Sequence, residues 1–425
     1  MYRLTNVVRP YAWGSTTAIA ELFGREPSGG PEAELWIGAH PDSPSRVQLA
    51  GGERPLDEFI KENPGAALGE TVLGLFGATL PFLTKVLAAD SALSLQVHPT
   101  LEQARAGFAA ENAAGISFND PQRSYRDDNH KPEMIFALSD FQALCGFRPP
   151  RDAARLLAGL KPRLADAGAA LDLLDEVLEL LGGGDEEAAL RGAFVALLDG
   201  GERSTRLAAD TARLLAATPV GSLGTEYAAV ARLGKLYPGD PGALISLLLN
   251  LVVLSPGQAL CLPAGNIHAY LQGLGVEVMA ASDNVLRGGL TPKFVNMPEL
   301  VKITNFRPIA PPMVKPTITD AGQELYCPPF AEFQLQRIEL ADGGSPVPLA
   351  QHGPAIVLAV SGSVLLDSPK SDLMLGRGEA AFIPDTEQPV NVHPAGDTGT
   401  GAVLFAVTTS GGTHEFDQQR TGATL

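Results

Sequence analysis

A stretch without proline, between Pro162 and Pro219, constrains the fold most, because the whole chain of 425 residues contains 34 prolines. Proline disrupts helix interiors, so its absence here favours helices. Apolar residues in and beside the stretch recur three and four positions apart, as on one face of an amphipathic helix. They include Leu156, Leu157, Leu160, Leu164, Leu173, Leu174, Val177, Leu178 and Leu181. We therefore predict an α-helical domain over residues 151–254.

The two flanks of this segment have a different pattern, in which short apolar runs are separated by Gly, Pro and Asp. The runs lie at 82–87, 93–98, 134–138, 258–262, 276–280, 333–340, 355–360, 380–383 and 402–407. Many short strands with turn residues between them are typical of β-sandwiches and β-barrels. Residues 308–316 contain four prolines and indicate a linker. The sequence thus predicts a mostly β fold with a helical insert.

The charge balance limits the classes of partner. Lys plus Arg number 31 and Asp plus Glu 48, which gives a formal net charge of −17. This acidity argues against nucleic acid and anionic membranes as partners, and an anionic substrate would need a local basic pocket. Three cysteines without CxxC spacing suit a reducing compartment. Since there is no signal-peptide pattern and no apolar run long enough to span a bilayer, we expect a cytoplasmic protein.

The segment SALSLQVHPT at 91–100 brings polar side chains to one face if it forms a strand. Ser94, Gln96 and His98 would then alternate with three apolar residues. A solvent-facing strand and a metal or substrate site account equally well for His98 on this segment alone.

The segment YRDDNHKPEMIFAL at 125–138 carries a dense group of ionisable residues directly before an apolar strand. A charged surface loop is the simpler interpretation for most of them. Glu133 differs, because its carboxylate adjoins the apolar strand and should be partly desolvated. Such a carboxylate should have a cation close by.

The segment GQALCLPAGNIHAYLQ at 257–272 predicts a strand, a tight turn and an inward-facing histidine. It resembles the second sequence motif of the cupin superfamily, with Gln272 in place of the final Asn. The matching positions are Gly257, Pro263, Gly265 and His268. The resemblance implies a metal ligand inside a β-barrel, which is the usual role of this histidine in the motif. A lone histidine at this position could also be structural.

Together, these three segments offer two imidazoles, one carboxylate and one amide oxygen. The set is Gln96, His98, Glu133 and His268. Such nitrogen and oxygen ligands suit Zn²⁺, with Mn²⁺, Co²⁺ and Fe²⁺ as competitors. A site with so few charged ligands leaves net positive charge on the metal, which helps it polarise a substrate carbonyl or hydroxyl.

The segment DNVLRGGLTPK at 283–293 places Arg287 before two glycines, where backbone can approach a ligand closely. An arginine in such a loop suits a phosphate or a developing enediolate charge. A surface arginine in a turn fits this segment equally well. The sequence contains neither a Walker loop nor a GxSxG elbow, nor a GxGxxG motif after a strand.

Six blocks of the sequence resemble one family, the type I phosphomannose isomerases, which are zinc enzymes of the cupin superfamily. The blocks are YAWGS (11–15), ELWIGAHP (34–41), LPFLTKVLAADSALSLQVHP (80–99), NHKPEMIFAL (129–138), FQALCGFRP (141–149) and the long block 256–293. The resemblance implies one zinc ion per chain, held by the four residues already named. It implies a monomer that interconverts mannose 6-phosphate and fructose 6-phosphate through a cis-enediol, with this small phosphosugar as its partner.

The resemblance also implies roles for other residues. The catalytic set is Arg287, Lys131, Lys85, Asp283 and Glu277, and the substrate-binding set is Ser94, Trp13, Tyr270 and Lys293. Lys85, Asp283, Glu277 and His98 all remain open as the base at C2. A lysine inside a barrel beside zinc could have a lowered pKa and act as that base.

The C-terminal region carries half of the cupin motif again, as GEAAFIP at 378–384. Thr386 and Pro389 stand where the motif has its Gly and His. We therefore predict two cupin-like jelly-roll barrels plus the α-helical domain. The metal-bearing catalytic cupin domain spans 1–150 and 255–310, and a metal-free jelly roll spans 311–425.

Two other classes compete with this interpretation. Two histidines and a carboxylate can hold Fe²⁺ for an oxygenase. A non-catalytic cupin that binds sugars is the second alternative, but it would not need Lys85, Lys131 and Arg287 at one cavity.

Overall fold

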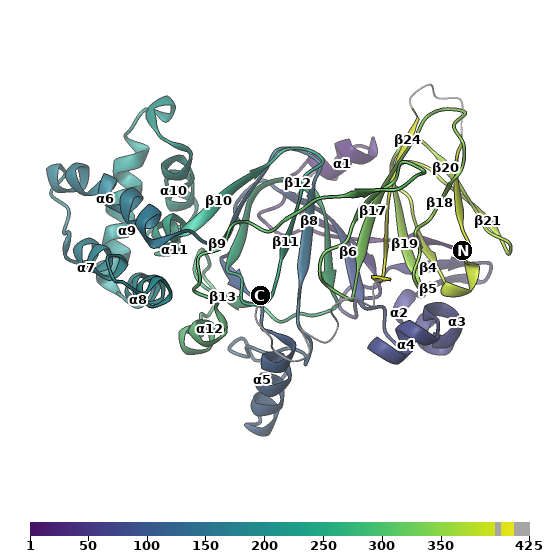
Figure 1. Cartoon of the computed structure of the whole chain (residues 1–425), viewed down its shortest axis with the longest axis horizontal. Helices are drawn as coiled ribbons and strands as arrows, with labels where there is room; N and C mark the ends of the chain where they lie inside the picture. The colour runs from purple at the N-terminus through teal and green to yellow at the C-terminus, as the bar shows by residue number, and fades with distance from the viewer. Residues whose placement is uncertain (396–400, 412–425) are drawn as a thin grey trace.

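The computed structural model describes residues 1–395 and 401–411. Helices contain 31% of the residues and strands 28%. The fold is therefore rich in β-structure, as predicted, but it is not mostly β, because helix is at least as abundant as strand. Three regions follow one another along the longest axis: a group of helices, a large central sheet, and two further sheets at the opposite end (Figure 1). This agrees with the prediction of strand-rich flanks around a helical segment.

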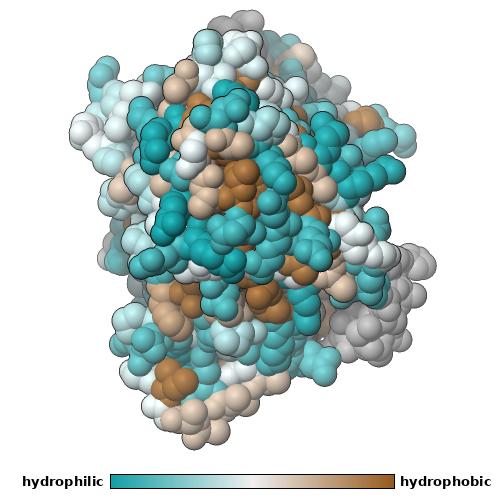
Figure 2. Space-filling model, turned by 90° about the vertical axis from the view of Figure 1, so that its left-hand side faces the viewer, coloured by the Kyte–Doolittle hydropathy of each residue, from teal (hydrophilic) through white to brown (hydrophobic). Residues whose placement is uncertain are grey.

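The helical region begins directly after the central sheet's strand β9 and is almost entirely helical. Its elements are α6 (Pro150–Asp166), α7 (Asp172–Leu181), α8 (Glu186–Leu198), α9 (Glu202–Ala216), η1 (Val220–Ser222), α10 (Thr225–Leu236), α11 (Gly242–Ile245) and η2 (Ser246–Leu248). The predicted leucines form its core, with Leu157, Leu160, Leu174 and Val177 at most 1% exposed. Seen from this end, most of the surface is hydrophilic, with small apolar areas between polar residues (Figure 2).

The prediction of a helical segment up to residue 254 is wrong for its last six residues, because Leu249–Leu254 forms a strand, β10. It pairs antiparallel with β9 (Phe141–Phe147), with Val252 opposite Ala143. Val252 and Val253 favour extended backbone, and the partner strand supplies the hydrogen bonds. The helical region is therefore joined to the central sheet at both of its ends.

The central sheet has 11 strands, arranged around the long strand β12. The first half of β12 pairs with β7 and β9, and the second half pairs with β6 and β8. Its elements besides β9 and β10 are β2 (Val7–Arg9), β3 (Glu34–Gly38), β6 (Phe82–Ala89), β7 (Gln96–Val97), β8 (Glu133–Ala137), β11 (Ala259–Leu262), β12 (His268–Ala280), β13 (Leu286–Arg287) and β14 (Met313–Val314).

The two faces of this sheet pack against different cores, as β6 shows. Phe82, Val86 and Ala88 join a core shared with the C-terminal strands. Leu87, on the opposite face, joins the smaller core that surrounds the candidate site. Every residue of β6 is buried, which is expected for a strand covered on both faces.

A nine-stranded sheet and a four-stranded sheet form the opposite end of the molecule. The larger one contains β15 (Thr317–Ile318), β16 (Glu324–Tyr326), β17 (Gln334–Leu340), β19 (Ala355–Ser361), β22 (Ala380–Ile383) and β24 (Ala402–Thr408). The smaller one contains β18 (Val347–Pro348), β20 (Val364–Asp367), β21 (Asp372–Leu375) and β23 (Asn391–Pro394). Side chains from the two sheets form a separate core.

Three N-terminal strands belong to the nine-stranded sheet, across the predicted domain boundary. They are β1 (Tyr2–Thr5), β4 (Arg46–Leu49) and β5 (Gly52–Pro55). Strand β1 pairs with β22, with Leu4 opposite Ala380, and also with β4. The assignment of residues 1–150 to the catalytic domain alone therefore does not follow the sheet pairing, because this pairing between chain ends leaves no local signal in the sequence.

Two smaller predictions need correction. The predicted linker 308–316 contains β14, which pairs with β11. The predicted strand 93–98 is reduced to Gln96–Val97. Backbone bonds from Leu93 and Leu95 go instead to carbonyls of Tyr270 and Gly289.

The remaining helices lie outside the sheets. They are α1 (Ala18–Phe23), α2 (Leu56–Glu62), α3 (Pro64–Leu68), α4 (Glu70–Phe76), α5 (Leu101–Ala113), α12 (Met297–Ile303) and η3 (Asp385–Glu387). Among the described residues, no helix has the length and apolar character that crossing a membrane requires. Cys145, Cys261 and Cys327 are all free thiols.

Candidate metal centre and active site

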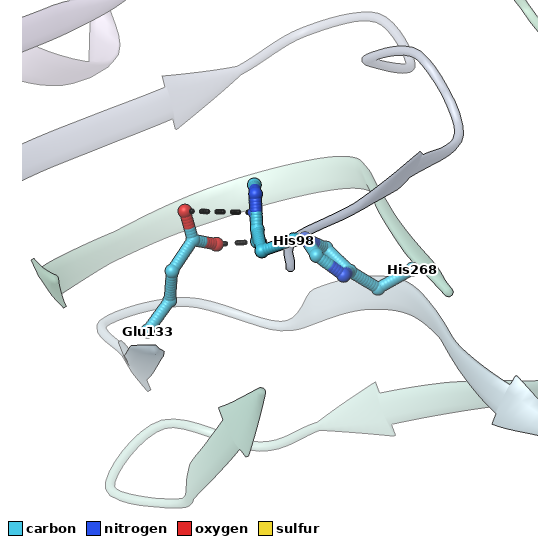
Figure 3. Close-up of side chains that lie close together, drawn as sticks. All are labelled: His98, Glu133 and His268. Carbon is cyan, nitrogen blue, oxygen red and sulfur yellow. Dashed lines mark ion pairs between the residues drawn. The ribbon is translucent and has the colours of Figure 1, made fainter. Parts of the chain in front are cut away.

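Three buried side chains from distant parts of the chain meet on the inner face of the central sheet (Figure 3). His98 Nε2 lies 3.3 Å from one carboxylate oxygen of Glu133. His268 Nε2 lies 3.5 Å from the other oxygen. The two imidazole rings are 5.1 Å apart, centroid to centroid. All three potential ligand atoms could therefore contact one ion.

Local structure explains why the two histidines converge. The turn between β11 and β12 has Gly265 at φ +77°, a conformation that side-chain-bearing residues rarely adopt. Gly265 donates its N–H to the carbonyl of His98 at 2.8 Å. His268 then begins β12, where it stands opposite Gln96 of β7. The turn thus holds both ligand segments together.

The hydrogen bonds of the two imidazoles define which nitrogen is bare. His98 Nδ1 lies 2.7 Å from the carbonyl oxygen of Asn284, and His268 Nδ1 lies 2.9 Å from that of Asn266. A carbonyl oxygen only accepts, so each Nδ1 carries the hydrogen and donates it. Neither Nε2 has a hydrogen-bond partner among the described residues. Both Nε2 lone pairs are therefore free to bind a metal, and the carbonyls fix the ring orientations.

Burial and charge keep these groups in the protonation states that a metal requires. Burial lowers the pKa of His98 to about 4, so its imidazole is neutral at pH 7. Glu133 is only 3% exposed. Burial alone would raise the pKa of Glu133, but the ammonium of Lys131 favours the ionised form, and the pKa lies well below its usual range. The ammonium of Lys131 lies 3.4 Å from this carboxylate.

Gln96, the predicted fourth ligand, lies on the two-residue strand β7 between two other predicted site residues. His268 is its partner on one side and Arg287 of β13 is its partner on the other. This register places Gln96 next to the histidine cluster. Its role as a ligand stays a prediction.

Lys85 lies in a row of residues that face the same side of the central sheet. It stands opposite Trp36 of β3 and Glu277 of β12. Its Nζ lies 3.0 Å from Glu277 and 3.6 Å from Glu34, and the side chain is almost fully buried. Burial would lower the pKa of Lys85, but Glu277 and Glu34 outweigh it and raise that pKa. The two carboxylates thus stabilise the ammonium form of Lys85, and a role for this lysine as the base stays a prediction.

Glu277 and Asp283, the two carboxylate candidates for the base, have different surroundings. Burial raises the pKa of Glu277 despite the nearby ammonium of Lys85. Asp283 is 41% exposed and lies 3.3 Å from His40 Nε2. Its partial burial would raise the pKa of Asp283, but the hydrogen bond from His40 outweighs this and lowers it. The N–H of Asp42 donates to His40 Nδ1, so Nε2 carries the hydrogen that Asp283 accepts.

A group of cations lies near the histidine cluster, since Arg287 pairs with Gln96 and Gln96 pairs with His268. Arg287 ends β13, Lys293 lies in the loop after it, and Arg126 comes from the segment before β8. Partial burial, and then the charge of Arg126, lower the pKa of Arg287. The charge of Arg287, then burial and Arg126, lower the pKa of Lys293. Mutual repulsion of this kind is relieved by an anion.

The predicted substrate-binding aromatic residues lie near the metal cluster. The Tyr270 ring is 6.3 Å from the His268 ring, and burial raises the pKa of Tyr270 well above its usual value. Trp13 is partly buried against the same inner core as Tyr270 and stacks on Tyr11 at 5.7 Å. Ser94 is half-buried, two residues before Gln96.

Several residues that organise the site were not singled out from the sequence. Asn284 is fully buried; its amide accepts from Arg126 N–H and donates to two carbonyls of the segment before β8. The carboxylate of Asp127 accepts from the N–H of Asp283 and the hydroxyl of Ser282. These residues join the segment before β8 to the loop that carries Arg287. The sequence shows the two motifs that contain these residues, RDDNHKPE and SDNVLRGG. It does not show that the two motifs are hydrogen-bonded to each other.

This fold and site define a class of protein: a β-rich, metal-dependent protein with a group of cationic side chains near a buried His–Glu–His cluster. Two imidazoles and one carboxylate are ligands that zinc commonly takes. Among the described residues, the cluster His98, Glu133 and His268 fits one zinc ion per chain.

Comparisons with known proteins agree with this class. The sequence profile of the phosphomannose isomerase type I catalytic domain matches residues 1–150. The mannose-6-phosphate isomerase of Salmonella typhimurium is 41% identical over 401 residues, covering 93% of this chain and 98% of the relative. Mannose-6-phosphate isomerase 2 of Arabidopsis thaliana is 32% identical, with 93% and 91% covered.

Solved structures of the same family share the fold. A zinc-bound mannose 6-phosphate isomerase superimposes with a TM-score of 0.83 at 39% identity, covering 96% of this chain and 99% of that one. A point mutant of the phosphomannose isomerase from Salmonella typhimurium has a TM-score of 0.85 with the same identity and coverage. This chain belongs to the type I phosphomannose isomerase family, which confirms the resemblance seen in the sequence.

Proposed function

We propose that this protein is a zinc-dependent aldose–ketose isomerase that interconverts mannose 6-phosphate and fructose 6-phosphate through a cis-enediol. The observation that carries the proposal is the convergence of two bare, buried imidazole nitrogens on one carboxylate, at His98, His268 and Glu133. The name of the relatives that cover nearly the whole chain supports the substrate.

The metal would be held by His98, Glu133 and His268, with the side-chain oxygen of Gln96 as the fourth ligand. Bound zinc would supply positive charge that stabilises negative charge on the substrate oxygens O1 and O2. The ammonium of Lys131, 3.4 Å from Glu133, is placed to donate a hydrogen bond in the same region. Together these groups would stabilise the enediolate that forms when the proton leaves C2, on the way to the cis-enediol.

The reaction also needs a base that takes the proton from C2 and returns it to C1. His98 is unsuited, because its Nδ1–H is donated to Asn284 and its Nε2 faces the metal position. Lys85 is unsuited because its ammonium is stabilised by two carboxylates. Of the two carboxylates, Glu277 is buried and held by Lys85, whereas Asp283 is 41% exposed and accessible to a substrate, so we propose Asp283 as the base.

The cations near the histidine cluster suit the phosphate. Arg287 and Lys293, with Arg126 beside them, repel one another and would be stabilised by a dianion. Ser94, Trp13 and Tyr270 would line the sugar between this region and the metal. Glu277 would keep Lys85 in place beneath the site.

The finer architecture also remains a proposal. The central sheet would be the metal-bearing cupin barrel, formed by 1–150 and 255–310, with the helical domain at 151–254 and a second jelly roll at 311–425. The sheet pairings suggest adding β1, β4 and β5 to the C-terminal unit and β10 to the barrel. Free thiols at all three cysteines support a cytoplasmic location, and we propose a monomer.

One assay tests the proposed function. Formation of fructose 6-phosphate from mannose 6-phosphate, measured with a coupled assay, should be abolished by a chelator and restored by zinc. Oxygen uptake with a sugar substrate, or sugar binding without turnover, would contradict the isomerase assignment.

A further inference from the structure

Asp240, from the helical region, contacts the loop that follows Arg287. It lies in the short connection between α10 and α11. One carboxylate oxygen accepts from the N–H of Gly242 at 2.7 Å and from that of Leu290 at 2.9 Å. The other oxygen accepts from the N–H of Thr291 at 3.2 Å. One side chain thus binds the backbones of two separate segments.

The loop adopts a conformation that needs such support. Leu290 has φ 54°, and it is the only non-glycine residue with a positive φ among the described parts of the chain. For a side-chain-bearing residue this conformation costs on the order of 1–2 kcal/mol. The Leu290 side chain is 1% exposed and packs into the core of the helical region. The surroundings, including the Asp240 carboxylate, therefore stabilise it.

The helical region and the loop are in direct backbone contact here. A Cβ on Gly242 would lie 2.8 Å from the nitrogen of Leu290. A Cβ on Gly289 would lie 3.1 Å from Asp240 Oδ1. Glycine at both positions allows the approach, so the carboxylate reaches the loop without an intervening side chain.

The other side of the loop is bonded to the segment that carries the metal ligands. Gly288 donates its N–H to the carbonyl of Leu95, and Leu95 donates to the carbonyl of Gly289. Arg287, directly before Gly288, pairs with Gln96 in the β7–β13 ladder. The position of Arg287 is therefore fixed from two sides. The segment with Leu95 and Gln96 holds one side of the loop, and Asp240 holds the other.

We propose that Asp240 is a positioning residue that acts through Arg287, so that the helical region contributes to the active site. The inference rests on the proposed isomerase function. A cavity of about 350 Å³, lined by Asp199, Asp240, Gly289 and Thr291 among others, lies beside the loop. Without the carboxylate, the loop has room to relax into this cavity, and the guanidinium of Arg287 moves with it.

A double-mutant cycle on the zinc-loaded, full-length enzyme tests the proposal. Asp240→Ala should lower kcat/KM for mannose 6-phosphate by about 10- to 100-fold, because small displacements of a charged group cost this much. Its zinc content should equal that of the unsubstituted enzyme. In an Arg287→Ala background the same substitution should cost less than about twofold, since its target is gone.

Two further variants complete the cycle. Asp240→Asn keeps an oxygen for Gly242 and Leu290 but loses the acceptor for Thr291, so its kcat/KM should be intermediate. If Asp240→Ala does not fold, the cycle is run with this variant. Asp199→Ala, an exposed carboxylate lining the same cavity, should match the unsubstituted enzyme in both backgrounds.

The outcomes separate the inference from the function on which it rests. Absence of isomerase activity in the unsubstituted, zinc-loaded enzyme would overturn the proposed function. An active enzyme in which Asp240→Ala, or Asp240→Asn in its place, has no effect would overturn the role of Asp240. Equal losses with and without Arg287 would also overturn it, because they indicate a purely structural contribution.

Discussion

His98 donates its Nδ1 hydrogen to the backbone carbonyl of Asn284, 186 positions away, across 2.7 Å. The same loop continues through Asn284 to Arg287. The orientation of a metal ligand and the position of the proposed phosphate-binding arginine are therefore coupled. A change in the backbone at Asn284 should therefore affect both zinc binding and turnover.

Replacing His268 with alanine should remove zinc and activity together, because the substitution deletes one of the two bare imidazole nitrogens. Zinc per chain, measured by elemental analysis after dialysis, should fall in parallel with isomerase activity. His393→Ala is the matched control, since His393 is partly exposed and pairs with Asp367 far from the cluster. Full zinc content and activity in His268→Ala would refute the ligand assignment.

Replacing Arg287 with alanine should leave zinc in place but lower kcat/KM by about 10²–10³-fold, the usual cost of losing a group that stabilises developing charge. Steady-state kinetics and metal analysis on the same preparation check this. Arg206→Ala, at an exposed position on α9, should behave like the unsubstituted enzyme. An unchanged rate and KM would place Arg287 outside the site.

Replacing Lys85 with methionine should destabilise the protein by about 3–5 kcal/mol, because Glu277 and Glu34 would be left buried without their cation. Urea unfolding of the metal-loaded protein measures the change. Lys161→Met removes an exposed pair with Asp175 and should cost about 0–1 kcal/mol. Equal losses of unfolding free energy for the two variants would show that the buried ion pair stabilises the protein no more than the exposed one.

Glu332 should stabilise the contact between the C-terminal sheets and the segment before β8. Its carboxylate lies 2.6 Å from His130 Nε2. Burial would raise the pKa of Glu332, but the hydrogen bond with His130 outweighs it and lowers that pKa below 4.5. A lowered carboxylate pKa adds stability above the unfolded value, and this stability is lost as the pH falls through the folded value.

Glu332→Gln should therefore lose about 1–3 kcal/mol at pH 7 and show a smaller further loss than the unsubstituted protein below about pH 4.5. Urea midpoints measured from pH 7 to pH 3 test both effects. Glu339→Gln is the control, since Glu339 is 65% exposed and pairs with Arg337 on its own strand. A pH profile identical to that of the unsubstituted protein would contradict the prediction.

Local patterns made much of the fold predictable. The leucine spacing gave the helical region, and β22 has the bounds that its apolar run predicted. The PxGxxH turn predicted the inward histidine, because Gly265 and the start of β12 are determined within a few residues. The strand predicted at 93–98 was too long, because only Gln96 and Val97 belong to a strand, whereas Leu93 and Leu95 donate to the carbonyls of Tyr270 and Gly289.

The remaining features depend on contacts between distant residues. The raised pKa of Lys85 depends on Glu34, which comes from another strand. Asn284 and Asp240 have ordinary local sequences, and their importance lies in which backbone groups they bind. Long-range partners of this kind have no periodicity that one sequence could reveal.

The pairing of β1 with β22 has a consequence for how the polypeptide is made. Strand β1 has one neighbour, β4, close after it along the chain, but its other edge stays open until Ala380–Ile383 are synthesised. An open edge is a template for unwanted association. Nascent chains should therefore be most prone to aggregate late in translation, and chains truncated before β22 should depend on chaperones.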